Sequence, residues 1–210
     1  MRPSIRSRLV YFDAVGRIGV MGTFMRDNPS VVLPLLLAAF SLALAADVPA
    51  PSPTGSAVTD AVAVVMPTQG QKVTGTVRFH RDGDSVHVTG ELSGLTPNAK
   101  HGFHLHEFGD CSAPDGASAG GHFAPEGHPH GAPDPATHHA GDLGNVEADA
   151  AGQAKVDVTL KGLGLASGER AIVGRAVVVH AQPDDLTSQP AGNAGARVGC
   201  GVVGVAKPGS

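Results

Sequence analysis

Residues 102–110, with the sequence GFHLHEFGD, place two histidines two positions apart in a segment that has the alternation of a β-strand. A strand advances about 3.3 Å per residue and its side chains alternate in direction. His104 and His106 therefore project from one face, about 6 to 7 Å apart, which is close enough for both to bind one metal ion. This segment predicts a metal site built on a β-strand.

Ten of the eleven histidines lie between His87 and His180. Residues 120–145 (GGHFAPEGHPHGAPDPATHHAGDLGN) contain five of them together with Asp142, and residues 177–185 (VVVHAQPDD) contain His180. A loop with histidines and an aspartate suits a second, neighbouring ion. Taken alone, such a loop also fits a solvent-exposed tract that scavenges metals. The histidines on separate strands and loops favour a built two-metal site instead.

Short β-rich runs alternate with turn signals along most of the chain. We expect strands at 61–66, 72–80, 85–92, 101–108, 146–150, 155–160, 171–180 and 200–206. Asp82-Gly83 between the second and third runs predicts a β-hairpin. The 29 glycines and 16 prolines favour turns and loops over helix, and no run has the pattern of an amphipathic helix. The sequence predicts an all-β antiparallel sandwich or barrel of about eight strands.

Composition and charge limit which residue types can form the core and which partners the protein can bind. Tryptophan is absent and aromatic residues make up 4%, so the core must consist of Val, Leu, Ala and a few Phe side chains. Five arginines and two acidic residues precede Ala46, which leaves 10 basic and 17 acidic residues in the remainder. A net charge of about −7 there argues against binding to nucleic acid or to an anionic membrane.

The first 56 residues carry the signs of export. The apolar run 31–46 follows Arg26 and contains Ala43-Leu44-Ala45, which fits a signal peptide cleaved after Ala45, with a possible upstream extension before it. The run is short for a membrane span, and an uncleaved membrane anchor is the alternative. We therefore expect a signal peptide at 1–45, a Pro/Ser-rich tether at 46–56 and a folded domain at 57–210.

The chain has two cysteines, Cys111 and Cys200. Export would place them where disulfides persist, so they are expected to pair with each other. The alternative is a pair of free, buried thiols.

The sequence resembles the copper/zinc superoxide dismutase family over residues 57–206. The resemblance rests on GFHLHEFGD together with SAGGHFAP at 118–125, HHAGDLGN at 138–145, IVGRAVVVHAQPDDL at 172–186 and GNAGARVGCGVVG at 192–204. These segments occur in the order that the family uses, and their separations match over most of the length. The resemblance implies a Greek-key β-sandwich or flattened barrel with long metal-binding and active-site loops.

The resemblance also implies an activity and two cofactors. The family disproportionates superoxide to O₂ and H₂O₂, with copper alternating between Cu(II) and Cu(I) and with a structural zinc. The copper ligands implied by the resemblance are His104, His106, His122 and His180, and the implied zinc ligands are His122, His130, His139 and Asp142. Four imidazoles suit a redox-active copper, whereas three imidazoles and one carboxylate suit a closed tetrahedral zinc site.

Other residue roles follow from the family pattern. His122 would bridge both metals and help to supply protons, and Arg197 would attract the anion beside copper. Asp184 would link a copper histidine to a zinc histidine, with a solvated turn as its alternative role. The family pairs a cysteine after the HLHEFGD strand with one in the last strand, where Cys111 and Cys200 lie.

The register of the zinc ligands is chosen by local pattern. The string HGAP selects His130 over His128, and the string HAGD selects His139 over His138, so His128 and His138 are expected to be solvated loop residues.

Two segments resemble the bacterial, exported branch of the family: the short, uncharged LTSQPA at 186–191 and the cysteine directly after GD. The expected location is the periplasm or the extracellular space, and a homodimer is a further expectation. The alternative function is a non-catalytic copper- and zinc-binding buffer or metal-delivery protein on the same fold.

Overall fold

A computed structural model describes residues 10–12, 18–20, 57–133 and 137–209. The chain divides into two compact units, and the first has a described antiparallel strand pair, β1 (Val10–Phe12) and β2 (Ile18–Val20). Among the described residues, no helix is long and apolar enough to cross a membrane. The apolar run expected to be a signal peptide and the tether at 46–56 lie outside the described residues.

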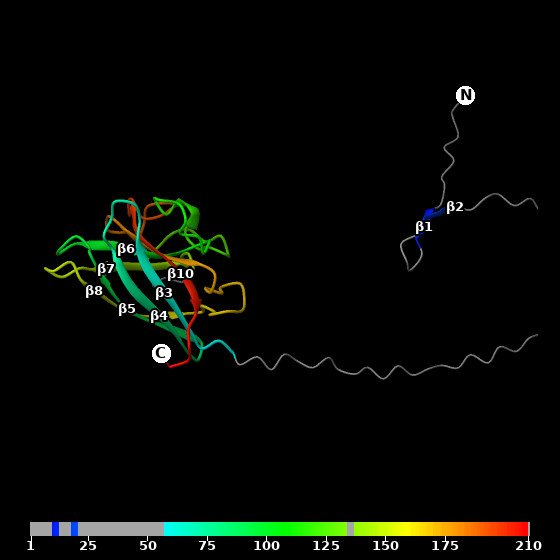
Figure 1. The fold of residues 1–210 in the computed structure, drawn as a ribbon, viewed down its shortest axis with the longest axis horizontal. Coiled ribbons are helices and arrows are strands. Elements are labelled where there is room, and N and C mark those ends of the chain that lie inside the picture. The colour runs from blue at the N-terminus through cyan, green and yellow to red at the C-terminus, as the bar shows by residue number, and fades with distance from the viewer. Residues whose placement is uncertain (1–9, 13–17, 21–56, 134–136, 210) are drawn as a thin grey trace, which may run out of the picture. The chain divides into compact units, whose positions relative to one another are not determined.

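The second unit is a single antiparallel sheet of eight strands in the order β7-β6-β9-β10-β3-β4-β5-β8 (Figure 1). The edge strands β7 and β8 also contact each other, so the sheet forms a nearly closed barrel. A 3₁₀ turn, η1 (Ala117–Ala119), is the one helical element in the described part of this unit. The all-β prediction is confirmed. The strands are β3 (Asp60–Pro67), β4 (Thr74–Asp82), β5 (Ser85–Ser93), β6 (Lys100–His106), β7 (Asp142–Glu147), β8 (Ala154–Lys161), β9 (Ala176–His180) and β10 (Arg197–Val205).

The connections follow a Greek-key path. Strands β3, β4 and β5 form a meander, in which each strand pairs with the next. Strand β6 does not pair with β5 but with β7 and β9, so the chain passes over two strands between β5 and β6. This crossover brings the HLH strand next to β9, which ends at His180. The topology therefore places segments that are far apart in the sequence side by side.

The predicted hairpin is confirmed. Asp82 pairs with Ser85 across a two-residue turn, and Gly83 has a φ of 56°. Such turns need a residue that tolerates positive φ, which glycine does without steric cost.

Several strand limits differ from the prediction. β7 begins at Asp142 rather than at 146, and β10 begins at Arg197 rather than at 200. β6 ends at His106 rather than at 108, and β9 begins at Ala176 rather than at 171. Residues 171–175 form a turn, in which Gly174 has a φ of 88°. Ile172 is buried in the main hydrophobic core although it lies outside any strand, so hydrophobicity alone overestimated the length of β9.

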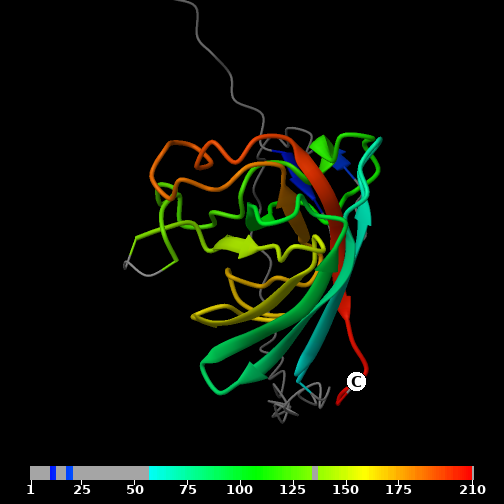
Figure 2. The same cartoon turned by 90° about the vertical axis from the view of Figure 1, so that its left-hand side faces the viewer.

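The core is built from the residue types that composition required. The largest fully buried side chains include Phe79, Phe103 and Leu105, surrounded by many valines and alanines. Strand β6 is buried on both faces from His101 to His106. Figure 2 shows the loop between β9 and β10, in orange, near the green loop that follows β6. These two loops cover the outer face of β6, and the histidines lie between the loops and the barrel.

Candidate metal centre

His104 and His106 lie on the same face of β6, as their spacing predicted. Both side chains are buried, and their ring centroids are 6.4 Å apart. The neighbouring strand β9 contributes His180, and an isolated bridge to His106 brings in His122 from the loop. Barrel strands therefore carry three of these four imidazoles, which gives the site a rigid base.

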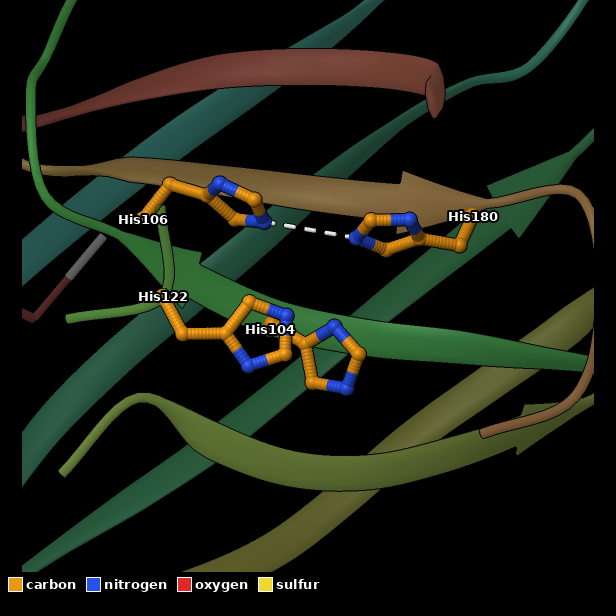
Figure 3. A group of neighbouring side chains, drawn as sticks. All are labelled: His104, His106, His122 and His180. Atoms are coloured by element: carbon orange, nitrogen blue, oxygen red, sulfur yellow. Dashed lines mark hydrogen bonds between the residues drawn. The ribbon is translucent and has the colours of Figure 1, made fainter. Parts of the chain in front are cut away.

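These four histidines form the first ligand group. One nitrogen from each of His104, His106, His122 and His180 lies within 4.8 Å of the others. Figure 3 shows the four rings around a common centre, with the dashed line joining His106 to His180, whose Nε2 atoms are 3.3 Å apart. The ring centroids of His104 and His122 are 4.0 Å apart. The group contains the four residues that the sequence predicted for copper.

The second ligand group shares His122 with the first. It consists of His122, His130, His139 and Asp142, whose ligand atoms also lie within 4.8 Å of one another. The Oδ1 atom of Asp142 is 2.9 Å from Nδ1 of His122, 2.9 Å from Nδ1 of His130 and 3.3 Å from Nδ1 of His139. The structure thus brings together the four residues predicted for zinc, and His122 is placed between the two groups.

The nitrogen atoms of the first group fit a metal ion. Nδ1 of His104 and Nε2 of His122 are buried and have no hydrogen-bond partner among the described residues. A buried polar atom without a partner is costly, and a metal ion would satisfy both atoms. The donor set fits copper in the first group and zinc in the second.

Backbone carbonyls orient two of the imidazoles. Nδ1 of His106 donates to the carbonyl of Gly120 at 2.9 Å, and Nδ1 of His180 donates to the carbonyl of Gly195 at 3.1 Å. Each bond fixes the tautomer and leaves Nε2 unprotonated and directed toward the first group. These carbonyls could not be predicted from the sequence, because any residue type can supply one.

Asp184 connects the two groups from behind. Its Oδ2 atom lies 2.7 Å from Nε2 of His104, and its Oδ1 atom lies 3.0 Å from Nε2 of His130. The carboxylate is buried and also accepts the N–H of Leu186. Burial raises the pKa of Asp184, but the hydrogen bonds from His104, Leu186 and His130 together lower it below its ordinary value. This side chain holds one imidazole of each group in a fixed orientation.

The backbone of the loop after β9 is adapted to Asp184. Gly192 has a φ of 63°, and a Cβ atom there would overlap the Asp184 carboxylate and Nε2 of His130. A side chain at this position would displace the carboxylate from both histidines.

The protonation states suit metal binding. Burial, with smaller contributions from the neighbouring imidazoles and from Arg197, lowers the pKa of His106 to about 2 and that of His180 to about 3. Both imidazoles are therefore neutral at pH 7, the form that binds metals. Burial alone would raise the pKa of Asp142, but hydrogen bonds, first from His122, and the nearby imidazoles hold it well below its usual range.

Arg197 lies at the edge of the first group. It begins β10, where it pairs with His180, and its guanidinium donates to the carbonyls of Gly116 and Gly120 at 2.5 Å each. The Gly120 carbonyl accepts from both Arg197 and His106. Burial lowers the pKa of Arg197, but an arginine remains charged at neutral pH.

The neighbouring loop histidines lie outside both groups. His138 donates from Nδ1 to the carbonyl of His139, and His128 does not contribute to either group.

Cys111 and Cys200 form a disulfide, as predicted, and their Cα atoms are 5.8 Å apart. The bridge joins the start of the loop after β6 to β10, three residues beyond Arg197. The described part of the chain has no free cysteine.

The arrangement of two ligand groups around a shared histidine agrees with the comparison to known proteins. Residues 73–203 match the family model described as copper/zinc superoxide dismutase. The chain belongs to this family. The superoxide dismutase [Cu-Zn] of Paramecium bursaria Chlorella virus 1 is 46% identical over an alignment of 157 residues, and the match covers 71% of this chain and 82% of the viral protein. The cofactors of the family are copper and zinc.

A solved structure also resembles the fold. A crystal structure titled as that of the clock protein EA4 is 38% identical, with a TM-score of 0.65, and the match covers 72% of this chain and 98% of that one.

Proposed function

We propose that this protein disproportionates superoxide, so that two superoxide anions and two protons give one O₂ and one H₂O₂. The observation that carries the proposal is the pair of four-ligand groups that share His122. His104, His106, His122 and His180 would bind copper, and His122, His130, His139 and Asp142 would bind zinc. Copper, when bound, supplies one-electron chemistry by alternating between Cu(II) and Cu(I).

The protein's own residues would bind the substrate, orient the ligands and supply protons. Arg197 presents a permanent positive charge next to the first group and would attract the superoxide anion. His122 would take up a proton at Nε2, the nitrogen that has no partner among the described residues, when this nitrogen is not bound to copper, and would deliver the proton with solvent to the reduced product. Asp184 would keep His104 and His130 in position throughout the cycle.

The alternative function is a copper- and zinc-binding buffer or metal-delivery protein. The fold alone does not decide between the two, because one fold can carry different functions. Loss of copper ligands or an added Cys-x-x-Cys module would favour metal delivery. All four predicted copper ligands are present in this chain, and it contains no Cys-x-x-Cys sequence.

One experiment separates the two functions. The purified protein is loaded with both metals, its copper and zinc contents are measured, and superoxide decay is followed by pulse radiolysis. We expect one copper and one zinc per chain together with rapid, saturation-free decay. Full metal content with superoxide decay no faster than in solution without protein would support the metal-buffer or metal-delivery function and contradict the enzymatic function.

We also propose that the protein is exported to the periplasm or the extracellular space. Two observations support this: the apolar run at 31–46 and the Cys111–Cys200 disulfide, a bond that persists in oxidising compartments. Fractionation of cells and N-terminal sequencing of the mature chain test the proposal. Mature protein beginning near Ala46 in the exported fraction is the expected result. An intact N-terminus in the membrane fraction would establish an anchor instead.

We further propose a homodimer formed through the outer face of β3 and β10. Val64 and Met66 on β3 are 57% and 59% exposed, and Val202 and Val205 on β10 are 44% and 61% exposed. Phe108, 52% exposed, lies two residues after the end of β6. Strands β3 and β10 are paired neighbours, so their exposed apolar side chains lie near one another, and exposed apolar surface favours association. In a two-fold dimer the same surface of each chain would meet.

Val64→Glu tests the dimer. Two opposed carboxylates at a two-fold interface would repel each other and lose their solvation, so we expect sedimentation equilibrium to show a monomer. Lys155→Glu on β8 introduces a carboxylate on another exposed surface and should leave the dimer intact. A wild-type protein that sediments as a monomer would refute the dimer.

A further inference from the structure

The uncharged loop at 186–191 makes a contact that the sequence did not predict. Gln189 lies in this loop, and His130 lies in the loop after β6, 59 positions earlier. The Gln189 side-chain carbonyl accepts the backbone N–H of His130 at 2.9 Å. Its amide group donates to the backbone carbonyl of His130, also at 2.9 Å. One side chain thus binds both polar atoms of a single residue's backbone.

The backbone of His130 has few other supports. Among the described residues, no backbone–backbone hydrogen bond involves residues 128–133. The adjacent Gly131 donates its N–H to Oδ2 of Asp142, so its support comes from a side chain as well. The segment is therefore ordered mainly by side-chain hydrogen bonds to its backbone, and the two from Gln189 act on the ligand residue itself.

The loop that presents Gln189 is internally fixed. Asp185 accepts the N–H groups of Thr187 and Ser188 at 3.0 and 2.7 Å, and the side-chain amide of Asn193 at 3.0 Å. The N–H of Gly192 also donates to the carbonyl of Ser188. Although Gln189 is exposed, the turn around Asp185 restricts where its amide can lie.

The segment between β9 and β10 holds both ends of His130. Asp184 accepts a hydrogen bond from the ring at Nε2, and Gln189 holds the backbone. The remaining ring nitrogen, Nδ1, faces Asp142 and the second ligand group. With the backbone and the far ring nitrogen fixed, the direction of Nδ1 is also fixed.

We propose that Gln189 is a positioning residue for the zinc site, which fixes the backbone of His130 so that its Nδ1 is preorganised for zinc. The inference rests on the proposed role of His130 as a zinc ligand. Loss of the two hydrogen bonds would let the ligand segment move and would raise the rate of zinc dissociation. Groups that orient a metal ligand without touching the metal typically contribute tenfold or more to affinity.

Gln189→Met tests the proposal, because methionine has a similar length and makes neither hydrogen bond. Zinc release from protein that contains zinc but no copper is followed with a chromophoric chelator. We expect release to be about tenfold faster than in the wild type. Gln71→Met is the matched control, since Gln71 is exposed and lies outside the loop, and it should release zinc at the wild-type rate. Gln189→Glu, which keeps the acceptor and loses the donor, should fall between.

A second measurement separates positioning from general stability. Cobalt(II) in the zinc site reports ligand geometry through its visible absorption, and we expect an altered spectrum in Gln189→Met. The midpoint of thermal unfolding of the metal-free variant should stay near that of the metal-free wild type. An unchanged zinc release rate would overturn the proposal. So would an unchanged cobalt spectrum together with a loss of stability that is equal with and without zinc, because a purely structural role would then explain the variant. If the His139→Ala and Asp142→Ala variants retain zinc, the assignment of the second ligand group to zinc fails instead.

Discussion

Arg197 is the single residue on which attraction of the substrate is expected to depend most. The folded domain is acidic overall, and the loop 186–191 contains no lysine or arginine. We therefore expect most of the local positive potential at the first ligand group to come from the metals and from Arg197, whose guanidinium is held by two carbonyls of the loop after β6.

We expect Arg197→Glu to lower the second-order rate at least about tenfold at low salt and to flatten its fall with ionic strength. Superoxide dismutase is itself a known example of electrostatic steering, so the prediction concerns the residue and not steering in general. Pulse radiolysis over a range of salt concentrations measures both effects, with metal contents checked. Lys155→Glu has the same change in net charge on β8 and should have little effect. A wild-type rate and salt slope in Arg197→Glu would refute this role.

His104 and His106 are expected to differ when each is removed, although both lie on β6. His106 is fixed by the carbonyl of Gly120, whereas His104 is joined through Asp184 to His130 of the second group. His106→Ala should therefore abolish copper binding and activity while zinc is retained. His104→Ala should also abolish copper binding and, in addition, weaken zinc. Metal analysis after dialysis measures both, and full turnover in either variant would contradict the copper-ligand assignment.

At the scale of elements, the loop between β6 and β7 depends on one side chain. Asp142, the first residue of β7, accepts the N–H groups of Gly131 and His139 at 3.0 and 2.9 Å, and its Oδ1 faces three imidazoles. Its carboxylate is buried. A loop this long needs such internal links to be ordered.

Asp142→Ala should remove zinc and lower the free energy of unfolding by roughly 3 to 5 kcal/mol. The reason is that the buried imidazoles and N–H groups that face the Asp142 carboxylate would lose their acceptor. Hydrogen exchange should become faster across residues 120–141 before copper is lost. Ala132→Gly changes the same loop without removing a ligand, so it serves as the control and should retain zinc. Unchanged zinc stoichiometry in Asp142→Ala would contradict the prediction.

The elements that local sequence specifies were predictable, and those set by packing of distant loops were not. The His-x-His alternation and the Asp82-Gly83 turn predicted β6 and a hairpin, because strand periodicity and turn chemistry are local. The start of β7 at Asp142 was not predicted, since a glycine-containing segment has no β-pattern until pairing with β6 orders it. The contact of Gln189 with His130 has no local signal, because it depends on how two loops meet.

At the scale of the whole molecule, the disulfide connects the barrel to the loop that shapes the first ligand group. Cys111 and Cys200 pack with Ala119, Ala176 and Val178 in a small buried cluster. The bridge spans 89 positions, and it joins β10 to the same loop whose carbonyls hold Arg197. A closed loop of this size restricts the unfolded chain strongly.

Cys111→Ser should therefore lower the free energy of unfolding by roughly 2 to 5 kcal/mol. Because the loop would then be tied to β10 chiefly through Arg197, the variant should also lose part of its activity below the temperature at which it unfolds. Denaturant titration measures stability, and superoxide decay at moderate temperature measures activity. Ser112→Ala, next to the bridge, should change neither by a comparable amount. Two reactive thiols in the native wild-type protein, or equal stability of the variant and the wild type, would show that the bridge does not hold the loop to the barrel.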